Sequence, residues 1–300
     1  MSARVKGIIS IVISAFGFAL MAMLVRLCDN CGEPIGAFQK SFFRNVISAA
    51  IALTVFAKAC PPRETIRFAP SLFLRGLFGT IGIVANYYAL SHITIAEGQT
   101  LNKTAQFFTV LFAWLFLGEK FSLRGATLLA LAFTGVLLIT KPGFAGADFL
   151  PLMMGLLGGI AAGAAYACTR QLAILKVNVK FIVAFFTVFA TLGTLPFIVS
   201  FGWQSMTISQ YLVLFAAGGA ALIGQYGITF AYRFAKAGEL SVYDYSNIIF
   251  TAAFGFLCFG QIPDIYSLFG ILLILIAGVC GMRPRLSLNR SDSRATLLRF

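Results

Sequence analysis

Ten apolar segments of helix length follow one another along the chain, and the connections between them are short. A helix crosses a bilayer with about 20 consecutive, mostly apolar residues, and each segment comes close to that length. The pattern predicts an all-α integral membrane protein with ten transmembrane helices and no separate soluble domain. The segments cover about residues 7–27, 34–57, 70–91, 95–118, 122–140, 151–174, 180–201, 208–232, 238–260 and 264–282.

Composition excludes a water-soluble fold. The chain has 300 residues, of which 59% are apolar and 11% charged, whereas charged residues make up about 25% of a typical soluble domain. The basic start MSARVKG precedes an apolar run of full span length that lacks a small-residue cleavage site. This run therefore indicates a first transmembrane helix that is retained and not a cleaved leader.

The positive charges predict how the helices are oriented. The formal net charge is +13, which would also suit a protein that binds nucleic acid. With the N-terminus in the cytoplasm, however, 17 of the 23 Lys and Arg residues border cytoplasmic ends; Arg75 lies just inside the third span, and Arg26 and Lys141 fall at the outer side. Membrane proteins enrich Lys and Arg in cytoplasmic loops. We therefore expect a multi-pass protein of the cell (cytoplasmic) membrane, with both termini cytoplasmic and no nucleic-acid partner.

Two stretches of the chain align without a gap at an offset of 142 residues, Tyr88–Phe121 and Phe230–Pro263, and share seven identities. Each holds the fourth span of a five-span half. Because five is odd, the second half enters the membrane from the opposite side, which predicts an inverted repeat of the kind found in secondary transporters. The predicted five-helix repeats cover 7–141 and 151–282, and a basic cytoplasmic tail covers 283–300.

Polar side chains inside the predicted spans form a candidate substrate site. In the fourth span, four polar residues recur at i, i+3, i+4 and i+7 and so share one helix face, which should not face lipid. The ninth span carries an acid between two tyrosines, and the second span carries two cations four residues apart. The predicted site residues are Gln99, Asn102, Lys103, Gln106, Asp244, Tyr243, Tyr245, Asn247, Lys40, Arg44, Tyr166 and Gln225.

Charge assigns roles within this set. Lys103, Arg44 and Lys40 would bind a carboxylate or phosphate, and Asp244 would bind an ammonium or sulfonium group or carry a coupling proton. Charged residues within spans usually face the bundle interior and pair with one another. A structural role therefore stays open for Lys103 and Asp244 as a static ion pair, and for Arg44 as a lock between helices. Lys40 lies near enough to the outer end of its span to reach toward the interface instead.

No motif for catalysis or nucleotide hydrolysis is present, because P-loop, HExxH and GxSxG patterns are all missing from the sequence. We therefore expect neither an enzyme nor ATP-driven transport by this chain alone, and no metal ion or cofactor. Cys28 and Cys31 lack the nearby ligands that a zinc site would need, and the sequence leaves their oxidation state open.

The stretch AEGQTLNKTAQFFTVLFAWLFLGEKFSLRGATLLALAFTGVLLI resembles the EamA-type repeat of the drug/metabolite transporter superfamily, and FFRN in the second span is similar to the family's Arg-bearing helix. The resemblance covers about residues 7–282 and implies a ten-helix carrier of small metabolites. Gln106 stands where many relatives have a proline, which leaves a helix break there an open question. Gln261 replaces, in the second half, the Glu119 of LGE, so that only one half would keep a contact made by this carboxylate.

These features predict a secondary active transporter that moves a small zwitterionic or anionic metabolite, such as an amino acid, across the bilayer by alternating access. The alternatives are a multidrug exporter of lipophilic cations, a carrier of nucleotide metabolites of the S-adenosylmethionine type, and a passive channel. A homodimer is compatible with the sequence. Substrate identity, direction and coupling are not encoded in any pattern described above.

Overall fold

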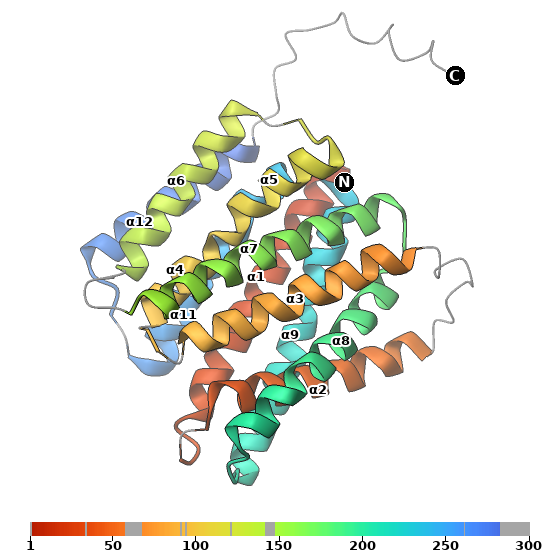
Figure 1. Ribbon diagram of the computed structural model, residues 1–300. Helices are drawn as coiled ribbons and strands as arrows, with labels where there is room; N and C mark the ends of the chain where they lie inside the picture. Colours follow the sequence, from red (N-terminus) through yellow and green to blue (C-terminus); the bar gives the residue numbers. More distant parts are fainter. Residues whose placement is uncertain are drawn as a thin grey trace, which may run out of the picture.

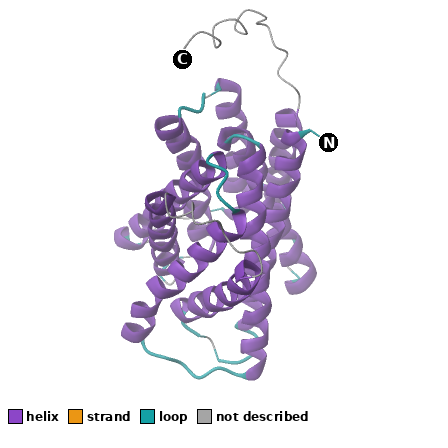
Figure 2. Ribbon diagram, turned by 90° about the vertical axis from the view of Figure 1, so that its right-hand side faces the viewer, coloured by secondary structure: helices purple, strands orange, loops and turns teal. Residues whose placement is uncertain are grey.

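The structure, a computed structural model, describes residues 2–33, 35–57, 68–90, 92–93, 95–120, 122–141, 148–260 and 262–282. Within these ranges the chain is all-helical and contains no strand (Figures 1 and 2). Its helical segments are α1 (Ala3–Cys28), α2 (Ala37–Ala57), α3 (Ala69–Leu90), α4 (Ile95–Lys103), α5 (Ala105–Leu117), α6 (Leu123–Thr140), α7 (Phe149–Ile174), α8 (Val179–Phe201), α9 (Ile208–Phe234), α10 (Ala237–Asp244), α11 (Ser246–Phe259) and α12 (Ile265–Met282).

Each predicted span coincides with one helix, except the fourth and the ninth, which coincide with the pairs α4–α5 and α10–α11. Seven helices in the described part of the chain are long and apolar enough to cross a membrane, by length and composition alone. The prediction of an all-helical protein with several membrane-spanning helices is confirmed. Ten crossings, inverted halves and cytoplasmic termini stay predictions.

The surface is apolar and the interior is partly polar, the reverse of a soluble protein. Large apolar side chains such as Phe116, Val199 and Ile208 are 77–80% exposed. Arg75 and Gln106, by contrast, are 2% and 3% exposed. Because the bilayer core offers no hydrogen bonds, an apolar exterior around buried polar groups is the arrangement that lipid requires.

The helices pack in pairs that correspond between the two halves of the chain. Helices α6 and α12 lie together at one edge and α2 and α8 at the opposite edge, with α1, α3, α7 and α9 between them (Figure 1). Helix α1 packs on α9 as α7 packs on α3, and α5 packs on α7 as α11 packs on α1. Most of the contact pairs, though not all, therefore have a counterpart when the two halves are exchanged, and α5 with α10 is an exception.

Glycines allow the two central pairs to approach closely. A Cβ atom added to Gly17 of α1 would lie 2.7 Å from the backbone nitrogen of Gly224 in α9, and one added to Gly82 of α3 would lie 3.3 Å from the carbonyl oxygen of Gly158 in α7. Gly82 and Gly224 are separated by 142 residues, the same offset that aligns the two halves of the sequence. Small residues at such crossings are typical of packing between membrane helices.

We expect Gly227→Ala to destabilise the protein, because the added methyl group would lie 2.8 Å from the backbone nitrogen of Ser14 and 2.9 Å from the carbonyl oxygen of Ser10. Forcing α1 and α9 apart should cost about 1–3 kcal/mol, seen as a lower Tm of the detergent-solubilised protein. Gly219→Ala in the same helix is the matched control, because a Cβ there meets nothing within 4 Å. An equal Tm for the two variants would contradict the expectation.

An ion pair joins the end of α6 to the start of α12. Lys141 Nζ donates to Asp264 Oδ2, and Asp264 Oδ1 accepts from the backbone nitrogen and the hydroxyl of Ser267. The hydrogen bond from Lys141, followed by those from Ser267, lowers the pKa of Asp264 from 3.8 to about 2. The carboxylate therefore caps α12 as long as it is ionised.

This depressed pKa gives the stability of the α6–α12 contact a defined pH dependence. Because the pKa of the folded state lies below that of the unfolded chain, the contribution is fully present above about pH 4 and is lost as the pH falls toward 2. We expect the Tm difference between the unsubstituted protein and Asp264→Asn to shrink over this window. The effect should be small because the pair is exposed, and a constant difference across the window would contradict it.

Candidate functional site

Two helix breaks bring the candidate residues to helix ends. Helix α4 ends at Lys103 and α5 begins at Ala105, while α10 ends at Asp244 and α11 begins at Ser246. The break residues keep helical dihedral angles, with φ −62° and ψ −20° at Thr104 and φ −65° and ψ −14° at Tyr245. Each break therefore bends its helix without unwinding it. The first break occurs two residues before Gln106 and without a proline, which answers the question that the sequence left open.

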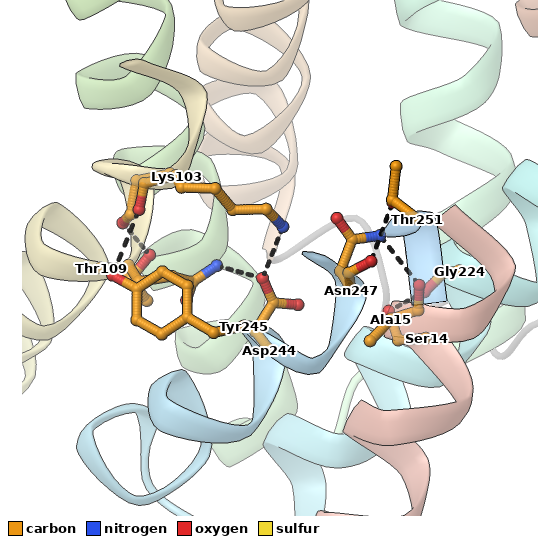
Figure 3. A network of polar contacts seen from close by, with 11 residues as sticks. Ser14, Ala15, Lys103, Thr109, Gly224, Asp244, Tyr245, Asn247 and Thr251 are labelled. Atoms are coloured by element: carbon orange, nitrogen blue, oxygen red, sulfur yellow. Dashed lines mark hydrogen bonds and ion pairs between the residues drawn. The ribbon is translucent and has the colours of Figure 1, made fainter. Parts of the chain in front are cut away.

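Asp244 connects the two halves of the chain. Its Oδ2 accepts a 2.6 Å hydrogen bond from Gln106 Nε2 and lies 3.5 Å from Lys103 Nζ (Figure 3). Lys103 and Asp244 are 8% and 5% exposed. The structure thus brings together three of the predicted residues, from α4, α5 and α10. Both contacts fall on one carboxylate oxygen, and Oδ1 accepts no hydrogen bond from any described residue.

Tyr245 and Asn247 brace the helices around Asp244. The hydroxyl of the fully buried Tyr245 donates a hydrogen bond to the carbonyl oxygen of Lys103 over 3.4 Å. This carbonyl at the end of α4 thereby gains a hydrogen-bond donor. Asn247 Nδ2 donates to the carbonyl oxygen of Ala15 in α1 over 2.9 Å (Figure 3). With their polar atoms engaged by the backbone, both residues position Asp244, and Tyr245 has no free face on which a ligand could stack.

Arg75 is a buried cation that the sequence did not single out. Its guanidinium carbon lies 3.7 Å from the ring centroid of Phe186, and its Nη2 donates to Gln225 Oε1 over 3.1 Å. Its Nε is buried and has no hydrogen-bond partner among the described residues. The positive-inside count left Arg75 just inside the predicted third span. Arg75 lies in the second turn of α3, and this distance from the helix start could have indicated that the side chain is inside the bundle.

Arg44 lies in the interior beside α1 and α3. Its Nη1 contacts Met21 Sδ at 3.2 Å, its Nη2 donates to Asn45 Oδ1 over 2.8 Å, and its guanidinium carbon is 5.9 Å from the Tyr87 ring centroid. Its buried Nε lacks a hydrogen-bond partner among the described residues. None of these neighbours is negatively charged, so the charge of Arg44 is not neutralised by a direct contact.

Lys40 lies apart from these residues. Its Nζ donates to Asp29 Oδ1, just beyond the end of α1. The structure therefore places it in an ion pair at the α1–α2 connection, in line with the interfacial alternative.

Tyr166 of α7 is a further candidate residue near these charged groups. Its hydroxyl lies within electrostatic range of Asp244, Arg75 and Arg44, and its ring centroid is 6.5 Å from that of Tyr232. The side chain is half-buried although helices surround it. We call the set of Arg44, Arg75, Lys103, Asp244, Gln106, Tyr166 and Gln225 the central site.

Three predicted residues have other positions. Asn102 is half-buried beside Lys103, and no polar partner is present among the described residues. Gln99 belongs to α4, but its side chain falls outside the described part of the chain. Tyr243 turns away from Asp244 toward α12, where its hydroxyl approaches Gly281. The expectation that two tyrosines flank Asp244 at one site is therefore wrong for Tyr243, because neighbouring residues on a helix point in different directions.

A second buried ion pair closes one end of the bundle. Arg170 Nε donates to Glu119 Oε1 over 2.7 Å, and Glu119 Oε2 accepts from the backbone nitrogen of Ala237 over 3.0 Å. The glutamate of LGE thus caps α10, the helix that carries Asp244, and pairs with α7. The corresponding Gln261 lies outside the described residues.

Comparison with known proteins shows to which proteins the chain is similar. A model of the EamA-like transporter family matches residues 5–141 and 149–282. The pseudopaline exporter CntI of Pseudomonas aeruginosa strain UCBPP-PA14 is 29% identical over 282 residues, which cover 93% of this chain and 97% of the relative. Solute carrier family 35 member G1 of Mus musculus is 29% identical over 290 residues, 90% of this chain and 76% of the relative.

Two further similarities concern cargo and fold. A riboflavin transporter of Rhizobium johnstonii is 28% identical over 222 residues, 73% of this chain and 72% of the relative. The crystal structure of a protein with 16% identity superposes with a TM-score of 0.75 over 90% of this chain and 97% of that chain. At this identity the structural likeness speaks for the fold alone.

Proposed function

The chain belongs to the EamA-like transporter family, and on this premise we propose that it is a secondary active transporter that moves a zwitterionic or anionic small metabolite across the cytoplasmic membrane by alternating access. The observation that carries the proposal is the charge of the central site. Lys103 is paired with Asp244, whereas Arg44 and Arg75 form no ion pair with any described residue and contact neutral groups instead.

An excess of positive charge in a membrane interior is unfavourable unless an anionic group binds next to it. A cation near the bilayer centre costs at least about 2.5–3.5 kcal/mol on insertion scales, and such residues mark substrate or ion pathways. Arg44 and Arg75 each keep a buried Nε without a hydrogen-bond partner among the described residues. A carboxylate or phosphate on the substrate would supply both the negative charge and the hydrogen-bond acceptors, because a guanidinium donates two parallel hydrogen bonds to such groups.

Asp244 would serve the opposite end of the substrate. Its free oxygen, Oδ1, can accept from an ammonium group, while Oδ2 stays bound to Gln106 and Lys103. It can also take up a coupling proton when no substrate ammonium is present. The site would thus recognise at least one carboxylate together with an amine, which describes an amino acid or an amino dicarboxylate.

The packing of the helices supports two halves that move against each other. Most contact pairs have a counterpart when the halves are exchanged, which supports the proposed five-helix repeats 7–141 and 151–282. The central site combines α2, α3, α4 and α5 from the first half with α7, α9 and α10 from the second. A rocking motion of the halves would therefore change the access to this site, which is how inverted repeats work in secondary transporters.

Small organic cargo is also what the relatives' names indicate, a pseudopaline exporter and a riboflavin transporter. The test is counterflow in proteoliposomes with three labelled compounds: a neutral zwitterionic amino acid, an amino dicarboxylate and the lipophilic cation tetraphenylphosphonium. We expect saturable counterflow of the amino dicarboxylate, with weaker uptake of the zwitterion. Uptake of tetraphenylphosphonium alone would favour a multidrug exporter, and a flux that does not saturate would favour a channel.

A further inference from the structure

A cavity of about 210 Å³ lies at the end of the bundle where α6 and α10 begin. Its walls come from the start of α1, the end of α5, the first turns of α6 and α10 and the end of α12. Arg44, Arg75, Lys103 and Asp244 do not line it. The cavity is therefore distinct from the central site, and the proposed transport function assigns it no role.

The rim of this cavity carries more positive than negative charge. Arg4, Lys120, Arg124 and Lys236 line it together with two acids, Glu119 and Glu239. The charge of each acid is already balanced, since Glu119 pairs with Arg170 outside the cavity and Glu239 lies 3.7 Å from Arg4.

Three cations are left over. Lys120, Arg124 and Lys236 form no ion pair with any described residue. Arg124 is held in place by a hydrogen bond from its Nη2 to the carbonyl oxygen of Cys280, over 2.6 Å. An anion entering the cavity would therefore meet an uncompensated charge of about three units, weakened by solvent at the exposed lysines.

Two helix N-termini adjoin the cavity, and that of α6 adds to this positive potential, whereas the carboxylate of Glu119 already caps α10. Helix α6 begins at Leu123 and contributes Gly125, and α10 begins at Ala237 and contributes Gly238. A Cβ on Gly125 would lie 3.9 Å from the carbonyl oxygen of Gly238, so the two first turns are close neighbours. The N-terminal turn of a helix presents backbone N–H groups and a partial positive charge to anions.

An independent observation concerns Tyr243, one of the residues that line the cavity. The residue is 7% exposed, and its buried hydroxyl has no hydrogen-bond partner among the described residues. The hydroxyl packs closely against Gly281, because a Cβ there would come within 2.9 Å of the hydroxyl oxygen. Buried hydroxyls are nearly always hydrogen-bonded in native proteins, so this donor is available to an oxygen of a ligand.

We propose that this cavity binds a phosphate group, carried either by the head group of an anionic phospholipid or by a soluble phosphate ester. The phosphate oxygens would take hydrogen bonds from Lys120, Arg124 and Lys236 at the rim and from Tyr243 inside. The inner wall of Val110, Leu129 and Val242 is apolar and suits the carbon atoms next to the phosphate. In the proposed orientation the cavity opens at the cytoplasmic leaflet, where basic pockets between helices bind anionic lipid head groups.

The test uses the full chain purified in neutral detergent. Native mass spectrometry measures the retention of phosphatidylglycerol against phosphatidylcholine, and thermal unfolding measures the response to inorganic phosphate against chloride at equal ionic strength. We expect the variant Lys120→Gln/Arg124→Gln/Lys236→Gln to weaken phosphate-dependent binding at least tenfold. The matched control, Lys176→Gln/Lys180→Gln/Arg233→Gln, removes the same charge from exposed positions that do not line the cavity and should bind as the unsubstituted protein does.

The two measurements separate the sources of the phosphate. Preferential retention of phosphatidylglycerol without a response to inorganic phosphate identifies the lipid, and the reverse identifies a soluble phosphate ester. Tyr243→Phe should weaken either response several-fold while keeping the packing of the ring. The proposal is overturned if the unsubstituted protein responds to neither ligand, if the cavity variant binds as tightly as the unsubstituted protein, or if the control variant loses as much.

Discussion

Asp244→Asn is expected to reduce substrate transport about 100-fold, the largest functional effect of any single substitution in this protein. Asparagine has the same shape and can keep the contact with Gln106, but it has no charge for a substrate ammonium group or for a coupling proton. The loss of one charge-assisted interaction of about 3 kcal/mol in the loaded state corresponds to this factor. The measurement is the initial rate of counterflow in proteoliposomes, normalised to the amount of folded protein.

A structural ion pair would give a different result in a second variant. Asp244→Asn alone leaves Lys103 buried without its counter-charge, which itself destabilises the fold. Lys103→Gln/Asp244→Asn removes both charges, so its Tm should return toward that of the unsubstituted protein while transport stays low. If the double variant transports normally, Lys103 and Asp244 merely link the halves, and the proposed site is wrong.

The matched control for this chemistry is Asp264→Asn. It makes the same substitution in an ion pair, but Asp264 lies at the exposed start of α12, outside the central site. Transport should remain near that of the unsubstituted protein. A loss of transport as large as that of Asp244→Asn would show that the assay responds to stability and not to the site.

The sequence predicted the helices well because lipid imposes one dominant rule. Each apolar segment must satisfy its own backbone hydrogen bonds, so length and hydropathy place the helix ends within a few residues. The helix-face argument worked for two of the four residues in the polar stripe of α4 and α5, since Lys103 and Gln106 converge on Asp244. Lys103 and Tyr245 correspond to each other at the offset of 142 residues that relates the two halves. In the structure the Tyr245 hydroxyl donates a hydrogen bond to the carbonyl oxygen of Lys103.

Contacts between helices distant in sequence could not be predicted in the same way. Arg75 follows a predicted cytoplasmic end, and it enters the interior because Phe186 and Gln225 receive its guanidinium there. Lys40 is directed to the connection between α1 and α2 because Asp29 lies within reach there. In both cases the contacting residue lies on another helix or loop and determines where the cationic side chain goes. A single sequence does not show which residues will contact each other in the fold.

Arg170→Met is expected to destabilise the protein by about 3–5 kcal/mol, because it leaves the Glu119 carboxylate buried without its counter-charge. The two side chains are 12% and 10% exposed, so water does little to solvate the remaining charge. The measurement is the free energy of unfolding in detergent. Arg4→Gln is the matched control, since its ion pair with Glu239 is 36% and 39% exposed and should contribute less than about 1 kcal/mol.

Removing both members of the buried pair separates the cost of an unpaired charge from the value of the pair. Arg170→Met/Glu119→Gln leaves no ion in the interior, and the glutamine oxygen can still accept from the backbone nitrogen of Ala237. We therefore expect this double variant to recover most of the stability lost in Arg170→Met. If it is as unstable as the single variant, the energy resides in the packing of Arg170 between α7 and α9, where its Nη1 also donates to the carbonyl oxygen of Tyr232, and not in the charge.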